Sequence, residues 1–191
     1  MTWDRVFFLT LLALIFLAQA TSLIGLVRRR VASDRGSAWA LVGAWQVVLI
    51  VSILEAWRFP ALWADPAWVG YAGAAAFAVG FALRLVAVKT LDAHFSPLVE
   101  LQPEHELVTH GPYAWVRHPA YLGSLLWAFA PPLLLGSGAG LIAAAVCYYP
   151  ALRYRVAVEE ALLAERFGDR WADYRARVPA LIPQPRRRPA S

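Results

Sequence analysis

Charged residues are scarce in this 191-residue chain. Asp, Glu, Lys and Arg make up only 16% of it, against about 25% in typical soluble domains, and 60% of the residues are hydrophobic. None of these four residue types occurs in four long stretches: 6–27, 36–54, 66–83 and 119–152. This scarcity argues against a soluble domain and predicts an integral membrane protein.

Cysteine is almost absent as well. The single Cys147 lies in an apolar stretch, which excludes a disulfide framework, and it has no Cys or His partner at metal-ligand spacing, so we expect no metal site. The net charge of +5 resides in arginines near the ends of the apolar stretches, without any nucleic-acid-binding motif. We therefore expect membrane lipids with anionic headgroups as partners, and no nucleic acid.

The apolar stretches set the expected fold. A bilayer core about 30 Å thick needs roughly 20 helical residues, so 6–27, 36–54 and 66–83 each predict one crossing. The stretch 119–152 has room for two short crossings, and "GSGAG" at 136–140 supplies a turn between them. We predict an all-α integral membrane fold of five transmembrane helices, the last two forming a short hairpin. The first stretch exceeds the roughly 7 to 15 residues of a signal-peptide core, which favours an anchor helix.

The distribution of basic residues orients this bundle. The loop after the first stretch holds four arginines and the loop after the second only one: Arg28, Arg29, Arg30 and Arg35 against Arg58. Lys and Arg accumulate in short cytoplasmic loops, so we place the N-terminus outside. The loop 89–118 and the tail from residue 153 are then cytoplasmic. The lack of an organelle signal favours a bacterial-type inner membrane.

Two regions outside the apolar stretches carry patterns of their own. Residues 95–101 and 105–110 are β-prone and are separated by "QPE", which predicts a small β-hairpin within the loop. The tail from 153 to 177 predicts an amphipathic helix that lies on the cytoplasmic face and breaks near Gly168. Its apolar side chains recur at spacings of four, four and three: Leu163, Phe167, Trp171 and Tyr174.

Polar side chains suited to chemistry gather in the second half of the chain. They lie in the loop, at the entrance of the fourth predicted helix and at the exit of the fifth: Glu100, His105, Glu106, Tyr113, Arg117, His118, Arg155, Glu159 and Glu160. We divide the chain into three N-terminal transmembrane helices, 1–88, and a catalytic region, 89–191. Arg155 and Glu159 stack one turn apart on a helix, which by itself predicts an ordinary ion pair. His118 by itself predicts a helix-entry residue with satisfied hydrogen bonds.

The order of short motifs in this half is more specific. "LVTHGPYAWVRHPAYLG" at 107–123 is followed by "EE" at 159–160, "FG" at 167–168, "Y" at 174 and "RVPALIP" at 177–183. This series, which covers about half the chain, from 95 to 183, resembles the isoprenylcysteine carboxyl methyltransferase family of integral membrane enzymes. Membrane phospholipid methyltransferases share the RHPxYxG and EE elements, so the resemblance identifies the wider family better than the substrate.

The resemblance implies a cytoplasmic site for S-adenosylmethionine, with S-adenosylhomocysteine as product. The positions that match the family's cofactor contacts are Glu100, His105, Glu106, Leu107, Val108, Tyr113, His118, Pro119, Ala120, Tyr121 and Glu159. Arg155 matches the position that meets the methyl acceptor, and we take it as the catalytic residue. Glu100 stands where relatives often carry Gln, in a loop that is shorter here.

The resemblance implies carboxyl O-methylation of an isoprenylcysteine-like or other lipophilic acceptor, a small molecule or prenylated substrate that enters from the bilayer. A sulfonium donor carries an activated methyl group, so a carboxylate needs placement, which Arg155 can provide, more than it needs a base. A phospholipid amine or a lipophilic thiol would need a base, with Glu160 or His118 as candidates. The alternative outside enzymes is a small transport or scaffold protein in which Arg155 and Glu159 merely pair. The oligomeric state stays open.

Overall fold

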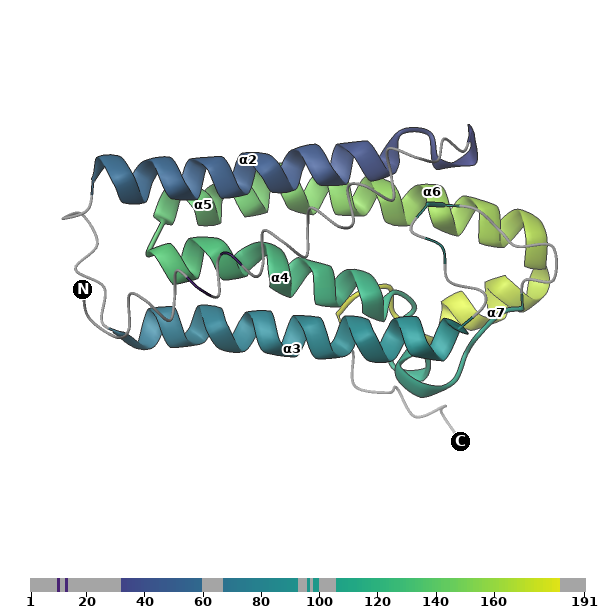
Figure 1. Ribbon diagram of the computed structural model, residues 1–191. Helices are drawn as coiled ribbons and strands as arrows, with labels where there is room; N and C mark the ends of the chain where they lie inside the picture. The colour runs from purple at the N-terminus through teal and green to yellow at the C-terminus, as the bar shows by residue number, and fades with distance from the viewer. Residues whose placement is uncertain are drawn as a thin grey trace.

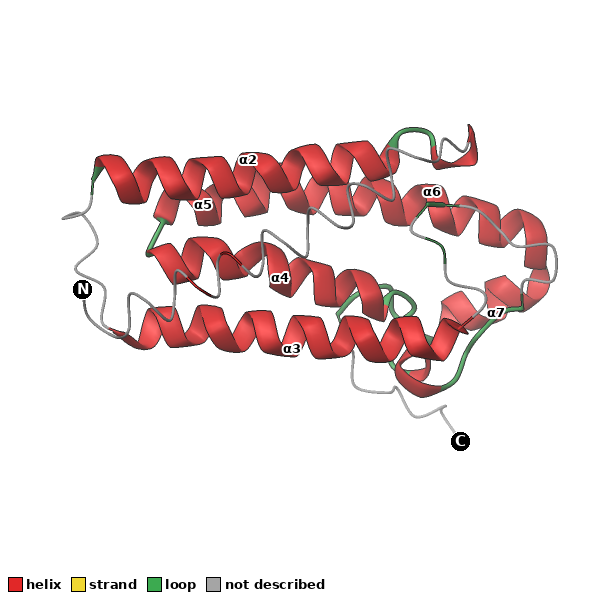
Figure 2. Ribbon diagram, viewed as in Figure 1, coloured by secondary structure: helices red, strands yellow, loops and turns green. Residues whose placement is uncertain are grey.

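The structure is a computed structural model and describes residues 10, 13, 32–59, 67–92, 96, 98–99 and 106–182. Every regular element in these ranges is helical (Figure 2). In chain order they are η1 (Ala32–Asp34), α2 (Ser37–Arg58), α3 (Ala67–Leu91), η3 (Gly111–Ala114), α4 (Pro119–Leu135), α5 (Gly138–Ala143), the π-helical η4 (Ala144–Tyr148), α6 (Tyr149–Phe167) and α7 (Asp169–Arg177). The predicted all-α class is confirmed for these ranges.

Three helices are long and apolar enough to cross a membrane. They are Ser37–Arg58, Trp68–Leu91 and Gly138–Phe167, the last formed by α5, η4 and α6 in succession. Helix α4, with 17 residues, is apolar too. These four correspond to the second to fifth predicted crossings. The first predicted crossing, 6–27, lies outside the described residues apart from two isolated positions, so the count of five stays a prediction.

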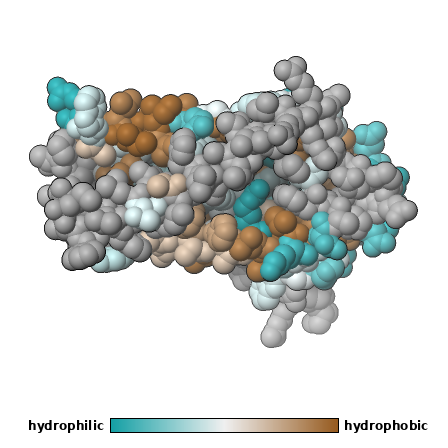
Figure 3. All heavy atoms as spheres, viewed as in Figure 1, coloured by the Kyte–Doolittle hydropathy of each residue, from teal (hydrophilic) through white to brown (hydrophobic). Residues whose placement is uncertain are grey.

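The outer faces of these helices are apolar. Large hydrophobic side chains stay exposed along α2, α3 and the α5–α6 helix, among them Ile50, Leu54, Val79, Val86 and Val146. On the face drawn in Figure 3, hydrophobic residues form a patch over the left-hand part of α2, while most hydrophilic residues lie toward the right-hand end. Exposed apolar surface of this extent suits contact with lipid tails.

The chain directions bring distant segments to one end of the bundle. Helices α2 and α4 begin at the right-hand end in Figure 1, where α3 and α6 finish and α7 turns back below α6. The turn between α4 and α5 lies at the opposite end. It uses Gly136 in the left-handed conformation, with φ +63°, and Ser137, whose hydroxyl accepts from the amide of Gly140 at 2.9 Å. The predicted helical hairpin is thereby confirmed, while the membrane crossing by α4 stays a prediction.

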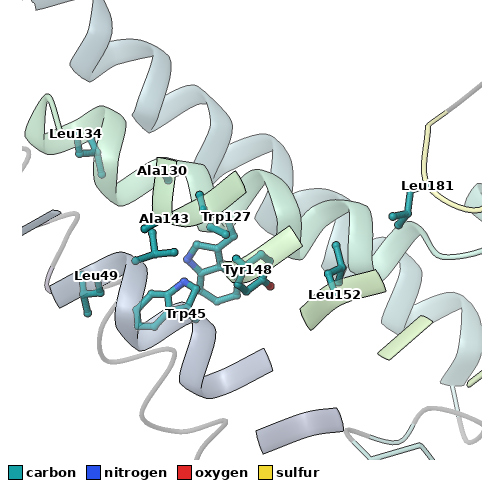
Figure 4. Close-up of a cluster of buried hydrophobic side chains, with 12 residues drawn as sticks. Trp45, Leu49, Trp127, Ala130, Leu134, Ala143, Tyr148, Leu152 and Leu181 are labelled. Atoms are coloured by element: carbon teal, nitrogen blue, oxygen red, sulfur yellow. The ribbon is translucent and has the colours of Figure 1, made fainter. Parts of the chain in front are cut away.

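Close packing joins the helices in the middle of the bundle. A Cβ atom added to Gly80 of α3 would lie 2.6 Å from the carbonyl oxygen of Gly123 on α4, so only glycine lets the two backbones approach this closely. Figure 4 shows the rings of Trp45, Trp127 and Tyr148 side by side, where α2, α4 and η4 meet. The apolar core therefore occupies the length of the bundle, and the polar groups are left for its ends.

The prediction of a surface helix in the tail from residue 153 is corrected by the structure. The tail does not start a separate surface helix at residue 153, because α6 runs without a break through Tyr149–Phe167. The break at Gly168 is confirmed, with φ +51°, and only α7 folds back. Leu163, Trp171 and Tyr174 are buried together across this break, as their spacing predicted.

The β-hairpin predicted within the loop is not confirmed. Residues 106–109, which belong to its second segment, have irregular backbone, and residues 98–99 of the first form a bend. Most of 95–105 lies outside the described residues. The division of the chain at residue 88 also stays a prediction.

Candidate active site

Arg155 of α6 lies at the polar end of the bundle with only 4% of its surface exposed. Its Nη1 donates to Asp34 Oδ1 at 2.9 Å and to Ser37 Oγ at 3.2 Å. Asp34 ends η1 and Ser37 begins α2, so the guanidinium joins α6 to the start of α2. A buried guanidinium needs such an anionic partner, because an uncompensated charge away from water is strongly unfavourable.

Tyr121, in the first turn of α4, connects Arg155 to Glu159. Arg155 Nε donates to the Tyr121 hydroxyl at 2.9 Å, and its Cζ lies 5.5 Å from the centroid of the tyrosine ring. The hydroxyl in turn donates to Glu159 Oε2 at 2.5 Å. The His118 ring stacks on Tyr121 at a centroid distance of 5.5 Å, with Nδ1 3.8 Å from Glu159 Oε1. Four residues predicted for the site thus form one connected cluster.

Glu160 binds the two residues that precede α4. Its Oε1 accepts from Arg117 Nη2 at 2.8 Å and from Arg117 Nε at 3.1 Å. The same oxygen lies 3.1 Å from His118 Nε2. Glu160 and His118, the two candidates for a base, are therefore in contact with each other, and Arg117 neutralises the carboxylate.

The segment after α7 closes this end of the bundle. The backbone amides of Arg117 and His118 donate to the carbonyls of Pro179 and Ala180 at 2.8 and 3.0 Å. The Arg117 side chain donates to the carbonyl of Val178 as well. Backbone carbonyls of the "RVPALIP" motif thus accept hydrogen bonds from the backbone amides of the "RH" in the earlier motif.

Tyr113 lies in η3 and is 7% exposed. Its hydroxyl donates to the carbonyl of Ala87 on α3 at 3.4 Å, and its own carbonyl accepts from the Tyr174 hydroxyl at 2.7 Å. Burial, and next the negative charge of Glu159, raise the pKa of Tyr113. Burial also raises the pKa of Tyr174 to about 12. Both hydroxyls therefore stay protonated donors at physiological pH.

The charge of Asp34 is stabilised in its buried position. Burial raises the pKa of this carboxyl, but hydrogen bonds from the amides of Ala38 and Val99 and the charge of Arg155 together outweigh it. The pKa of Asp34 therefore lies below its ordinary value, and the carboxylate is ionised whenever the protein is near neutral pH.

The predicted site residues fall into three groups. Arg155, Tyr121, Glu159 and His118 are in contact, with Pro119 and Ala120 in the same helical turn, and the charge of Glu159 acts on Tyr113. Glu106 is exposed and Val108 half-buried, whereas Leu107 packs against the buried cluster of Leu163, Trp171 and Tyr174. Glu100 and His105 lie outside the described residues. Their roles as cofactor contacts stay predictions.

Sequence reasoning missed Asp34 and Ser37. The spacing of Arg155 and Glu159 predicted a simple ion pair one turn apart, but Arg155 also binds Asp34, and Tyr121 bridges the two residues of the expected pair. One signal was available, because Asp34 is the only acid between residues 5 and 54. An acid at the start of a long apolar helix needs a partner, and an arginine at the same end of the bundle provides it.

The fold and the cluster together define a helical membrane protein with an ionic, largely buried site at one end of its bundle. Residues 73–165 match the model of the isoprenylcysteine carboxyl methyltransferase (ICMT) family. This match confirms the resemblance found in the motifs.

Curated relatives carry the same family name. The protein-S-isoprenylcysteine O-methyltransferase of Tribolium castaneum is 31% identical over 146 residues, which cover 75% of this chain and 50% of that protein. The enzyme of the same name from Schizosaccharomyces pombe is 36% identical over 107 residues, 55% of this chain and 45% of that protein. This chain thus spans about half the length of the curated relatives it matches.

A solved structure agrees with the fold. The structure described as the eukaryotic intramembrane Ras methyltransferase ICMT aligns with a TM-score of 0.63 at 33% identity. The alignment covers 75% of this chain and 50% of that chain. The likeness therefore extends over most of this chain and supports its assignment as an integral membrane protein.

Proposed function

We propose that this chain is an S-adenosylmethionine-dependent membrane methyltransferase that forms a methyl ester on the carboxylate of an isoprenylcysteine-like acceptor. The observation that carries the proposal is the position of the Tyr121 hydroxyl, 2.9 Å from Arg155 Nε and 2.5 Å from Glu159 Oε2. It joins the residue assigned to the acceptor with a residue assigned to the donor. The names of the relatives, protein-S-isoprenylcysteine O-methyltransferases, support the same activity.

The charges of the cluster suit a cationic donor. Three carboxylates lie here: Asp34 pairs with Arg155, Glu160 pairs with Arg117 and, at 3.9 Å, with the exposed Arg175, and Glu159 accepts from the Tyr121 hydroxyl. The carboxylate of Glu159, which is held by a neutral hydroxyl, favours a ligand with a positive sulfonium or ammonium group in a region partly shielded from water. The charges of these residues therefore support S-adenosylmethionine as the ligand rather than an anionic cofactor.

The donor side of the proposed site has Glu159 at its centre. Its carboxylate would accept a hydrogen bond from ribose or pair with an ammonium group, while His118 stacks behind it on Tyr121. We assign the nucleoside to the backbone of Glu106, Leu107 and Val108 and to Tyr113, with Pro119 and Ala120 along its edge. Glu100 and His105 complete the proposed contacts.

The acceptor side requires orientation rather than proton transfer. When bound, S-adenosylmethionine supplies a methyl group on a positively charged sulfur. Arg155 would hold the acceptor carboxylate by charge-assisted hydrogen bonds so that one oxygen points at that methyl carbon. Transfer would form the oxygen–carbon bond and break the carbon–sulfur bond, with the bonding pair left on sulfur. No proton leaves the acceptor, so neither His118 nor Glu160 has to act as a base.

A lipid-tailed acceptor agrees with the surroundings of the cluster. The helices that carry it expose apolar side chains to the outside, so a hydrophobic tail can stay in the bilayer while its polar head reaches Arg155. The arginines of the sequence 28–35, together with the contact of η1 with α6 through Asp34 and Arg155 at one end of the bundle, support a cytoplasmic position for the site.

The test is a methyl-transfer assay on the full chain in lipid vesicles. It uses S-adenosylmethionine with a labelled methyl group and three acceptors: a farnesylcysteine analogue, phosphatidylethanolamine and an alkyl thiol. Base-labile label on the farnesylcysteine analogue is the expected product. Stable label on the amine or the thiol would overturn the carboxyl assignment.

A binding measurement separates an enzyme from a transport or scaffold protein. We expect S-adenosylhomocysteine to bind the wild type and to bind the Glu159→Ala and Tyr113→Ala variants at least about tenfold more weakly, because each loses a polar or aromatic contact. Glu165→Ala, which changes an exposed acid on the same helix, is the matched control. Absence of binding by the wild type would contradict the enzyme assignment.

A further inference from the structure

Asp34 is held in place by groups that do not belong to the proposed reaction. It is 3% exposed, and its Oδ2 accepts from the amide of Ala38 at 3.0 Å. Its Oδ1 accepts from the amide of Val99 at 3.1 Å and from the Ser37 hydroxyl at 3.2 Å. The bond from Arg155 Nη1, at 2.9 Å, is a fourth. Three hydrogen bonds therefore fix the carboxylate without help from Arg155.

Arg155 depends on such an anchor. Its side chain has several freely rotating bonds, and ordering it costs conformational entropy. The contact to Asp34 fixes Nη1, and the contact to the Tyr121 hydroxyl fixes Nε. Two fixed nitrogens determine the plane of a rigid guanidinium, so Asp34 and Tyr121 together set the direction in which Arg155 presents its hydrogen-bond donors.

We propose that Asp34 is a positioning residue that aligns Arg155 for the methyl acceptor and partly offsets its charge. This inference rests on the function proposed above. A guanidinium already paired with Asp34 orients an arriving carboxylate but binds it less tightly, so the carboxylate keeps more of its nucleophilicity. Asp34 lies outside residues 73–165, which match the family model, and 121 positions before Arg155. The N-terminal part of this chain thereby contributes directly to the geometry of the site.

The experiment compares three variants of the full chain: Asp34→Asn, Asp34→Glu and Ser33→Ala. Ser33→Ala is the matched control, because the Ser33 hydroxyl donates to the carbonyl of Val99 at 2.6 Å and so ties the same two segments together without touching Arg155. The number of S-adenosylhomocysteine sites and their Kd are measured first by calorimetry. Steady-state kinetics with the farnesylcysteine analogue then give kcat and KM per functional binding site.

We expect Asp34→Asn to lower kcat/KM for the acceptor by about tenfold to a hundredfold per binding site, while the Kd for S-adenosylhomocysteine stays within about twofold. Asp34→Glu should recover part of the loss, because it restores the charge with one methylene of displacement. Ser33→Ala should keep kcat/KM within about twofold of the wild type.

If the wild type is active, any of three results would overturn the inference. The first is an unchanged kcat/KM per binding site in Asp34→Asn, and the second is an equal loss of kcat/KM in Ser33→Ala. The third is a loss only in the number of binding sites in both Asp34 variants, because this would indicate that Asp34 acts in folding alone. If the wild type methylates none of the three acceptors, the proposed function fails, and this inference fails with it. The wild-type assay therefore separates the two failures.

Discussion

The middle of the bundle and its polar end are held together in different ways. In the middle, helices meet through apolar side chains and glycine contacts, such as the approach of Gly80 to Gly123. At the polar end, side-chain hydrogen bonds join residues far apart in the chain, 34 with 155 and 121 with 159. Packing tolerates exchanges that conserve volume, whereas a buried polar network depends on particular atoms. We therefore expect substitutions in the middle to act through stability alone, and substitutions at the polar end to act on the proposed chemistry as well.

The largest expected effect of a single substitution is that of Arg155→Ala on methyl transfer. Loss of the guanidinium should lower kcat/KM at least about a hundredfold, because the acceptor is no longer oriented, while binding of S-adenosylhomocysteine stays nearly unchanged. Labelled methyl transfer and calorimetry measure the two quantities. Arg153→Ala, which removes an exposed arginine two positions away, should have little effect on either. An equal loss of transfer and binding in Arg155→Ala would place this residue in the cofactor site.

A second substitution tests the middle of the bundle. Gly80→Ala should lower the free energy of unfolding by about 1–3 kcal/mol, since its Cβ would lie 2.6 Å from the carbonyl oxygen of Gly123 and the helices would have to separate. Thermal unfolding in detergent measures the change. Gly43→Ala is the control, because a Cβ there meets no atom within 4 Å. Equal unfolding midpoints for the two variants would contradict the close contact of α3 with α4.

A smaller effect is expected where a hydroxyl joins α7 to η3. Tyr174→Phe removes the hydrogen bond to the carbonyl of Tyr113, 2.7 Å long and buried, and should cost about 1 kcal/mol of stability. Tyr154→Phe removes a bond of 2.9 Å to the carbonyl of Arg35, but that side chain is exposed. Water can replace the second bond, so its loss should cost less. A larger cost for Tyr154→Phe, seen in urea unfolding, would reverse the comparison.

The smallest expected effect is that of Asp34 on the stability of the protein at acidic pH. The folded state lowers the pKa of Asp34, so this carboxylate contributes stability above its unfolded pKa of about 3.9 and loses that contribution as the pH falls through the folded pKa. Unfolding midpoints measured from pH 7 to pH 3 should therefore fall less steeply in Asp34→Asn than in the wild type below about pH 4. Parallel curves for the two proteins would show that the ionised carboxylate of Asp34 does not stabilise the folded state.

Most of the fold could be predicted from the sequence because the signals are local. A stretch without charge predicts a crossing from its own composition, and the turns at Gly136 and Gly168 are marked by the residues that form them. The tail from residue 153 was interpreted wrongly for a physical reason. Its polar residues are typical of a solvated helix face. In the structure, however, Arg155 binds Asp34 and Glu160 binds Arg117 within the protein, and α6 is part of the bundle.

The candidate site was predictable only in part. The ordered motifs indicated Tyr121, Arg155 and Glu159, and these residues are in contact. The partner of Arg155 was not predictable in the same way, because a hydrogen bond across 121 positions leaves no mark in the spacing of residues. Only the three-dimensional arrangement of α2 beside α6 brings Asp34 to it.

The backbone bonds from the entrance of α4 to the segment after α7 have a consequence for biosynthesis. The amides of Arg117 and His118 find their acceptors at Pro179 and Ala180, some sixty positions later in the chain. When α4 leaves the ribosome, the acceptors of these two amides have not yet been synthesised. The polar end of the bundle can therefore be completed only after α7 and the segment that follows it have been synthesised.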